Sequence, residues 1–312
     1  MSPAILLGRR VSHALQTAAL LGGMALLAGY LGWALLGTGG LVVAAAAVVI
    51  VLGYAPRFSP HMLLRITGAS ELAPAQAPGL HRLVGSLSAR AGLARAPRLF
   101  YVPTRVLNAF AVGRRDDAAI AVTDGLLRRL APREIAGVLA HEITHVRSND
   151  VWVMTLAELV SQMTRTLSFF GLMLLFFMLP FSLFGAGGAP FLPVLVMVFA
   201  PTISAALQLA LSRTREYDAD IGAVALTGDP RGLASALDML EKLQGGWMER
   251  MFMARVPQWL RSHPETKERV RRLMALEGSE PVEAGEWTSD PFFSQPRVER
   301  PPRWHWLGSW YQ

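Results

Sequence analysis

Two long stretches without a charged side chain constrain this chain more than any other feature. They cover residues 11–56 and 166–212, and neither contains Asp, Glu, Lys or Arg. A helix needs roughly 20 apolar residues to cross the hydrocarbon core of a bilayer. A pair of buried core helices is the soluble alternative for the second stretch, but a soluble core has little use for an uncharged run of this length. The two stretches therefore predict membrane segments.

Each stretch has the pattern of a helical hairpin, because a glycine-rich turn divides it into two apolar runs. A cleaved signal peptide or a re-entrant second segment is the alternative for the first stretch. The four expected spans are residues 15–36, 41–54, 167–183 and 191–211. The sequence thus predicts a mainly α, polytopic membrane protein with two helical hairpins and about four transmembrane helices.

Charge predicts the orientation of these spans. The formal net charge is +7, and nearly all the basic residues are arginines. Such a charge suits nucleic acid or an anionic membrane surface, and the apolar stretches favour the lipid bilayer as partner over nucleic acid. Both turns are uncharged, whereas the flanks carry Arg9, Arg10, Arg57, Arg65, Arg165, Arg213 and Arg215. By the positive-inside rule we expect a multi-pass membrane protein with both termini and the polar regions in the cytoplasm.

Residues 57–165 and 213–278 have the mixed pattern of a water-soluble α+β domain. Leucines at helical spacing predict a helix over residues 79–91. Short β-like runs at 98–102, 106–112 and 118–122, punctuated by Asn, Gly, Arg and Asp, then predict a small antiparallel meander. Further helices are expected around residues 135–146, 215–227, 230–243 and 262–276, followed by an irregular Pro- and Trp-rich tail over 279–312.

The motif Ala140-His141-Glu142-Ile143-Thr144-His145 carries the clearest chemical signal. Residues four apart lie on one face of a helix, so His141 and His145 can reach the same metal ion. Glu142 is rotated away from them and can hold a water molecule on the metal. This is the zincin pattern. The chain has no cysteine, so a zinc site must be completed by His, Asp or Glu.

A candidate for the missing ligand follows the second apolar stretch. Glu216 and Asp220 lie one helical turn apart in Glu216-Tyr217-Asp218-Ala219-Asp220. Glu216 could bind zinc, and Asp220 could accept the second ring N–H of a ligating histidine. Alternatively, both acids could pair with Arg213 and Arg215 on a solvated face. Glu216 lies three residues beyond Arg213, about 5 Å along a continuous helix, so a zinc bound here is expected close to the cytoplasmic membrane surface.

Taken together, these motifs resemble the HtpX-like membrane zinc metalloproteases, relatives of the CAAX prenyl proteases. The resemblance rests on 140–145, on Ser212 to Asp220, on Leu107-Asn108-Ala109-Phe110-Ala111 with Val122 to Leu127, and on Ser262-His263-Pro264. It covers residues 80–273 and implies a gluzincin-type catalytic domain that faces the cytoplasm and holds one Zn²⁺. It also implies that the protein lies in a bacterial-type inner (plasma) membrane.

The resemblance also implies a role for each matching residue. His141, His145 and Glu216 would be the zinc ligands, Glu142 the general base and Asp220 a partner of a ligating histidine. Asn108, Ala109, Phe110 and Ala111 would pair with an extended substrate, unless they form an ordinary edge strand. His263 would donate to the oxyanion, unless it merely follows a helix cap.

The expected organisation has five parts, with a catalytic domain in two halves. They are an N-terminal hairpin (1–56), a first catalytic part (57–165), a second hairpin (166–212), a second catalytic part (213–278) and the tail (279–312). The resemblance implies cleavage of damaged or misfolded membrane proteins for quality control, and the expected position of the zinc implies substrates in or close to the membrane. The alternatives are a prenyl-protein protease, an intramembrane metalloprotease, and a non-catalytic chaperone or scaffold with the same fold.

Overall fold

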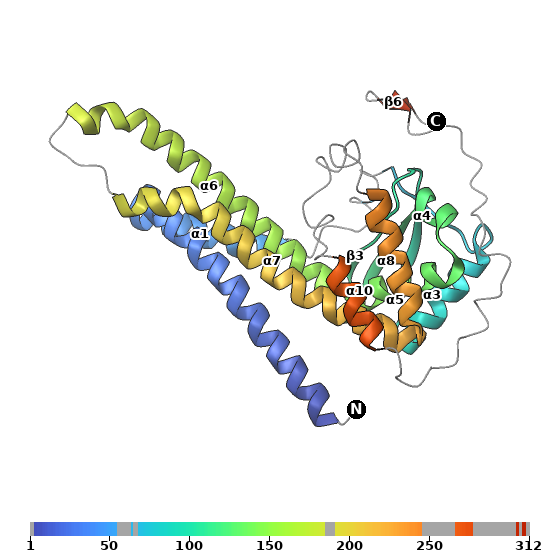
Figure 1. The fold of residues 1–312 in the computed structure, drawn as a ribbon. Coiled ribbons are helices and arrows are strands. Elements are labelled where there is room, and N and C mark those ends of the chain that lie inside the picture. The colour runs from blue at the N-terminus through green and yellow to red at the C-terminus, as the bar shows by residue number, and fades with distance from the viewer. Residues whose placement is uncertain are drawn as a thin grey trace. The chain divides into compact units, whose positions relative to one another are not determined.

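The computed structural model divides the chain into two compact units (Figure 1). The helical unit comprises Met1–Arg57 and Val153–Arg213, and the sheet unit comprises Phe58–Trp152 and Thr214–Gln312. The structure describes residues 3–54, 64, 68–184, 191–244, 266–276, 304–305 and 308–309. Residues 153–165, which the sequence groups with the polar region before them, lie in the helical unit.

Three helices of the described chain are long and apolar enough to cross a membrane. They are α1 (Pro3–Tyr54), α6 (Asp150–Phe184) and α7 (Phe191–Thr227), and their candidate spans are Leu15–Ile50, Asp150–Phe177 and Leu195–Thr227. Large apolar side chains such as Leu26, Phe176 and Phe199 point outward from them. A helix with apolar side chains on its outer face is suited to lipid rather than water.

Helix α1 is not straight, and its two segments pack against each other (Figure 1). Leu36 and Gly37 have non-helical backbone angles, and Gly37 has φ of +63°, which glycine adopts readily. A Cβ atom on Gly32 would lie 2.9 Å from the Cβ of Ala44. In a straight helix residues 32 and 44 would be about 18 Å apart. The chain therefore reverses at Leu36–Gly37, and Gly32 allows the two segments to approach closely.

Polar side chains join α6 to α7 inside the helical unit. Gln208 Nε2 donates to Glu158 Oε2 at 2.8 Å, and Arg165 Nη2 donates to Glu158 Oε1 at 2.6 Å. The hydroxyls of Ser204 and Ser161 are hydrogen-bonded at 3.1 Å. Buried polar groups in an apolar environment are costly unless they are paired, so these contacts favour one alignment of the two helices.

The sheet unit contains a four-stranded mixed sheet rather than an antiparallel meander. Its strands lie in the order β1-β2-β4-β3, and the bounds are β1 (Ser70–Glu71), β2 (Arg98–Val102), β3 (Ala109–Arg114) and β4 (Asp117–Thr123). Strands β3 and β4 pair antiparallel as predicted, but β2 pairs with β4 in parallel, with Leu99 opposite Ile120. The meander prediction was wrong because β3 does not pair with β2. Strand β3 lies at the edge of the described sheet, and β4 lies between β2 and β3.

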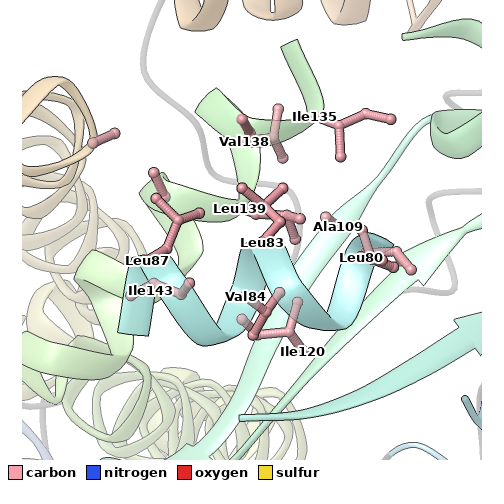
Figure 2. Packing of buried hydrophobic residues seen from close by; sticks show 14 of the residues in the cluster. Leu80, Leu83, Val84, Leu87, Ala109, Ile120, Ile135, Val138, Leu139 and Ile143 are labelled. Atoms are coloured by element: carbon pink, nitrogen blue, oxygen red, sulfur yellow. The ribbon is translucent and has the colours of Figure 1, made fainter. Parts of the chain in front are cut away.

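Helices α3 (Pro78–Arg90) and α5 (Pro132–Ser148) pack on one face of this sheet. Helix α8 (Pro230–Gln244) packs against α5, and α10 (Thr266–Ala275) packs against α8. The short helix α4 (Asp124–Arg129) follows β4, and a short pair, β5 (Trp304–His305) and β6 (Gly308–Ser309), comes last in the chain. Figure 2 shows Leu83 of α3 next to Leu139 of α5, while Leu80 and Val84 of α3 lie next to Ala109 and Ile120 of the sheet. Strand residues alternate between this core and a smaller one on the other face that contains Phe100.

Local chemistry defines both ends of α5. Pro132 occupies the first turn, where its missing N–H costs nothing, and the Glu134 carboxylate accepts a hydrogen bond from Ala131 N at 2.7 Å. Asn149 ends the helix in the left-handed conformation, with φ of +60°. Gly137 faces α8, where a Cβ would lie 2.9 Å from the Leu233 backbone. The helix that carries the metal-binding motif is thus fixed at its ends and closely packed along its length.

Candidate metal centre

Helix α5 directs both histidines of the motif to one point. The Nε2 atoms of His141 and His145 lie 3.1 Å apart, and their rings meet edge to face. His141 and Glu142 are buried, and His145 is largely so. The i,i+4 spacing therefore gives the convergence that the sequence predicts.

Glu216 on α7 reaches the same point. Its Oε2 lies 3.4 Å from His141 Nε2, and its Oε1 lies 3.6 Å from His145 Nε2. One ligand atom from each of the three residues lies within 4.8 Å of the others. Two imidazole nitrogens and a carboxylate oxygen are a donor set that zinc accepts, and three protein ligands leave a position for water or substrate. The residues present fit one zinc ion.

Close packing of α7 against α5 makes this convergence possible. Gly222 lies on α7 opposite Thr144, the residue before His145. A Cβ on Gly222 would lie 2.7 Å from Thr144 Oγ1 and would overlap its methyl group. Thr144 is itself held by a hydrogen bond from its hydroxyl to Ala140 O at 2.8 Å. A side chain at position 222 would therefore require Thr144 or one of the two helices to move.

Strand β3 lies beside Glu142, at the edge of the described sheet. The backbone N–H of Ala111 donates to Glu142 Oε2 at 2.9 Å. Ala109, Phe110 and Ala111 belong to β3, whereas Asn108 precedes it and exchanges hydrogen bonds with Thr123. The structure thus brings the expected general base next to the expected substrate strand.

Asp220 lies next to His141, and Arg269 of α10 holds it there. Asp220 Oδ1 is 3.0 Å from His141 Nδ1. Arg269 donates to Asp220 Oδ2 at 2.8 Å and to Oδ1 at 2.6 Å, and its Nη1 lies 3.0 Å from Glu216 Oε2. Asp220, Glu216 and Arg269 are all buried, so the two acids do not lie on a solvated face.

Asp150 has the corresponding place next to His145. Its Oδ2 lies 3.1 Å from His145 Nδ1, and its Oδ1 is paired with Arg215 Nη1. Sequence reasoning missed Asp150, Arg215 and Arg269 as contributors to the site. A signal existed for Arg269, which shares a helical face with the apolar Leu273 four residues later.

Burial and carboxylates act in opposite directions on the two histidines. Burial lowers the pKa of both imidazoles, because it disfavours the charged form. Hydrogen bonds outweigh it: those to Asp220 and Glu216 raise the pKa of His141, and those to Asp150 and Glu216 raise the pKa of His145 well above its usual value. Metal binding at these imidazoles is therefore linked to protons, and a lower pH should weaken it.

His263, the expected oxyanion donor, lies outside the described residues, and α10 begins at Thr266.

Comparisons with known proteins relate the chain to a peptidase family. The model of peptidase family M48 matches residues 74–277. Three relatives are named "Protease HtpX homolog". The one from Paraburkholderia phytofirmans is 35% identical over 74% of this chain and 86% of its own length. The one from Acaryochloris marina is 38% identical (84% of this chain, 94% of its own), and the one from Nostoc punctiforme is 33% identical (88% and 100%). The crystal structure of S. mikatae Ste24p aligns with 87% of this chain and 66% of its own, at 21% identity and a TM-score of 0.40.

The family model covers more than half of the chain, and its match contains all of His141, Glu142, His145 and Glu216. The relatives exceed 30% identity over most of their own length. Long apolar helices accompany the metal-binding cluster in the same chain. The chain therefore belongs to peptidase family M48, and it is a membrane metalloprotease.

Proposed function

We propose that this protein is a zinc-dependent endopeptidase that cleaves damaged or misfolded membrane proteins at the cytoplasmic face of a bacterial inner membrane. One observation carries the proposal. His141, His145 and Glu216 converge on one point, and Glu142 lies beside them in contact with the sheet edge. The chemistry for peptide hydrolysis and a strand to hold a peptide therefore occur together.

In this proposal His141, His145 and Glu216 hold the zinc ion. When bound, zinc lowers the pKa of a coordinated water to about 7 and polarises the scissile carbonyl. Glu142 accepts the proton of the attacking water and delivers it to the leaving nitrogen. The hydrogen bond from Ala111 N orients the Glu142 carboxylate. Asp220 accepts the Nδ1–H of His141 and so leaves the Nε2 lone pair for the metal.

The substrate is an extended polypeptide that adds a strand to β3. Ala109, Phe110 and Ala111 lie on the edge strand, and main-chain hydrogen bonds along such an edge are a common mode of peptide binding. His263, in Ser262-His263-Pro264, is proposed as a donor to the oxyanion from the motif alone.

Membrane proximity defines the substrate class. Arg114, at the end of β3, stacks over the ring of Trp152 at 5.5 Å, and Trp152 lies in the first turn of the helix whose candidate span begins at Asp150. Tryptophan is typical of the membrane–water interface. Ala111 and Arg114 are three residues apart on β3, which is about 10 Å along a strand. A substrate paired with β3 at Ala111 would therefore lie within about 10 Å of Arg114 and its partner Trp152. The scissile bond would then lie close to the bilayer.

The proposed topology has four spans in two hairpins, because the reversal of α1 at Leu36–Gly37 divides its apolar stretch in two. With arginines at the flanks and none at the turns, both termini and the two catalytic parts, 57–165 and 213–278, are cytoplasmic.

Purified full-length protein in detergent, wild type beside Glu142→Gln, tests the proposed activity. The variant should keep its zinc, because Glu142 is not a ligand, and should lose peptide hydrolysis by about 10²-fold or more. Arg147→Gln, on the same helix, serves as a matched surface control and should cleave normally. Undiminished cleavage by Glu142→Gln would refute the assigned mechanism.

A further inference from the structure

Both histidines of the metal centre are supported in the same way. Each imidazole has a buried carboxylate at Nδ1, and each carboxylate is in turn held by an arginine. The first of these groups is His141–Asp220–Arg269, and the second is His145–Asp150–Arg215. Building on the proposed zinc site, we infer that Asp150 and Arg215 are positioning residues for His145, and that they couple its orientation to helices α6 and α7.

The contacts at His145 are direct and buried. Asp150 Oδ2 lies 3.1 Å from His145 Nδ1, while the other carboxylate oxygen is paired with Arg215. Asp150 is 2% exposed and Arg215 is 9% exposed. Such burial excludes most water from the pair, so the carboxylate depends on protein groups for its hydrogen bonds.

This arrangement fixes which ring nitrogen faces the metal. With Nδ1–H donated to Asp150, Nε2 of His145 is the ring nitrogen on the side of Glu216, whose Oε1 lies 3.6 Å away. Without the carboxylate, the ring could rotate or adopt the other tautomer. Arg215 holds Asp150 in place, because its Nη1 is paired with the carboxylate oxygen that does not face His145. Asp150 therefore acts through His145, and Arg215 acts through Asp150.

The positions of the two residues in the fold give the pair a second role. Asp150 is the first residue of α6, immediately after the left-handed Asn149 that ends α5. Arg215 lies on α7, next to Glu216. Both helices contain candidate membrane spans. A shift of either helix end would move Asp150 or Arg215, and with it the imidazole of His145.

Zinc affinity tests this inference independently of activity. In full-length protein in detergent, Asp150→Asn and Arg215→Gln should each weaken zinc binding about 10- to 100-fold in competition with a chelator. The double variant should lose little more than Asp150→Asn alone, because Arg215 acts through Asp150. Arg215→Lys should recover part of the loss. Arg213→Gln removes an exposed arginine from the same helix and should bind zinc as the wild type does.

Cobalt substitution distinguishes positioning from a general effect on stability. The visible d–d bands of Co²⁺ report ligand geometry, so Asp150→Asn and Arg215→Gln should change them, whereas Arg213→Gln should not. If Asp150→Asn fails to fold, Arg215→Gln decides the question alone. Wild-type zinc affinity and an unchanged cobalt spectrum in the folded variants would overturn the inference and leave the proposed protease intact. A wild-type protein that binds no zinc would overturn both.

Discussion

At the scale of single residues, the metal centre depends as much on a missing side chain as on its charged groups. Gly222 lets α7 approach α5 so closely that a Cβ would meet Thr144 Oγ1 at 2.7 Å. Thr144 is buried and hydrogen-bonded within α5, so it has little freedom to move away. The distance between the helix of His141 and His145 and the helix of Glu216 is therefore set partly by this glycine.

Replacing that glycine should separate the ligands. Gly222→Ala is expected to lower the free energy of unfolding by about 1–3 kcal/mol through overpacking, and to weaken zinc binding as well. Thermal unfolding and chelator competition, both in detergent, measure the two effects. Gly85→Ala in α3 is the matched control, since a Cβ there meets nothing within 4 Å and should be neutral or stabilising. Unchanged zinc affinity and stability in Gly222→Ala would show that the helices tolerate a wider spacing.

The sequence predicts the residues whose geometry is local. The convergence of His141 and His145 follows from helical spacing alone, and the absence of cysteine directs attention to carboxylates such as Glu216. It does not predict that Arg269 contacts Asp220, because these residues meet only through the packing of α10 against the rest of the sheet unit. Arginine is also seldom fully buried, so a surface position is the ordinary expectation.

At the scale of elements, short strands are easier to locate than to connect. The strand β2 lies where the apolar run 98–102 predicts it, and β4 differs from its prediction by one residue at each end. The predicted meander was antiparallel throughout, whereas β2 and β4 pair in parallel. The prediction failed because strands that follow each other in the sequence need not be neighbours in the sheet. The order β1-β2-β4-β3 places β3 at the edge beside Glu142. The strand order that the sequence did not predict therefore leaves β3, the expected substrate strand, at the edge of the described sheet.

The pairing of α6 with α7 rests on Glu158 as well as on apolar contacts. Glu158→Leu removes the carboxylate that accepts hydrogen bonds from Gln208 and Arg165. Both donors must then find other acceptors in a largely apolar environment. We expect a loss of about 1–2 kcal/mol, seen as a lower thermal midpoint in detergent. Glu158→Gln keeps an amide oxygen for Gln208 and should lose less. Equal stability of Glu158→Leu and wild type would show that this polar contact contributes nothing to the helix pair.

At the scale of the whole molecule, the metal centre and the membrane topology depend on each other. His145 and Glu216 lie on opposite sides of the second apolar stretch in the sequence, so both of its ends must return to the same side of the membrane. The sequence predicts this requirement directly, because the charge-free stretches and their arginine flanks are visible without a structure. The reversal inside α1 is equally visible as a glycine-rich turn.

Single-cysteine labelling can test this topology cleanly, because the chain contains no cysteine of its own. Gly39→Cys lies beside the reversal of α1, where added atoms meet nothing within 4 Å, and Asp116→Cys lies in the exposed turn between β3 and β4. In intact cells a membrane-impermeant maleimide should label position 39. It should reach position 116 only after the inner membrane is permeabilised. The reverse order of labelling would contradict the cytoplasmic orientation.

We propose that Glu216, which lies beyond the second apolar stretch, completes a zinc site with the two histidines. The zinc content of purified full-length protein, wild type beside Glu216→Ala, decides whether it does, with Glu241→Ala on the exposed face of α8 as control. Wild type and Glu241→Ala should hold one zinc per chain after dialysis against a weak chelator, and Glu216→Ala should lose most of it. Full zinc retention by Glu216→Ala, or none in the wild type, would contradict the claim.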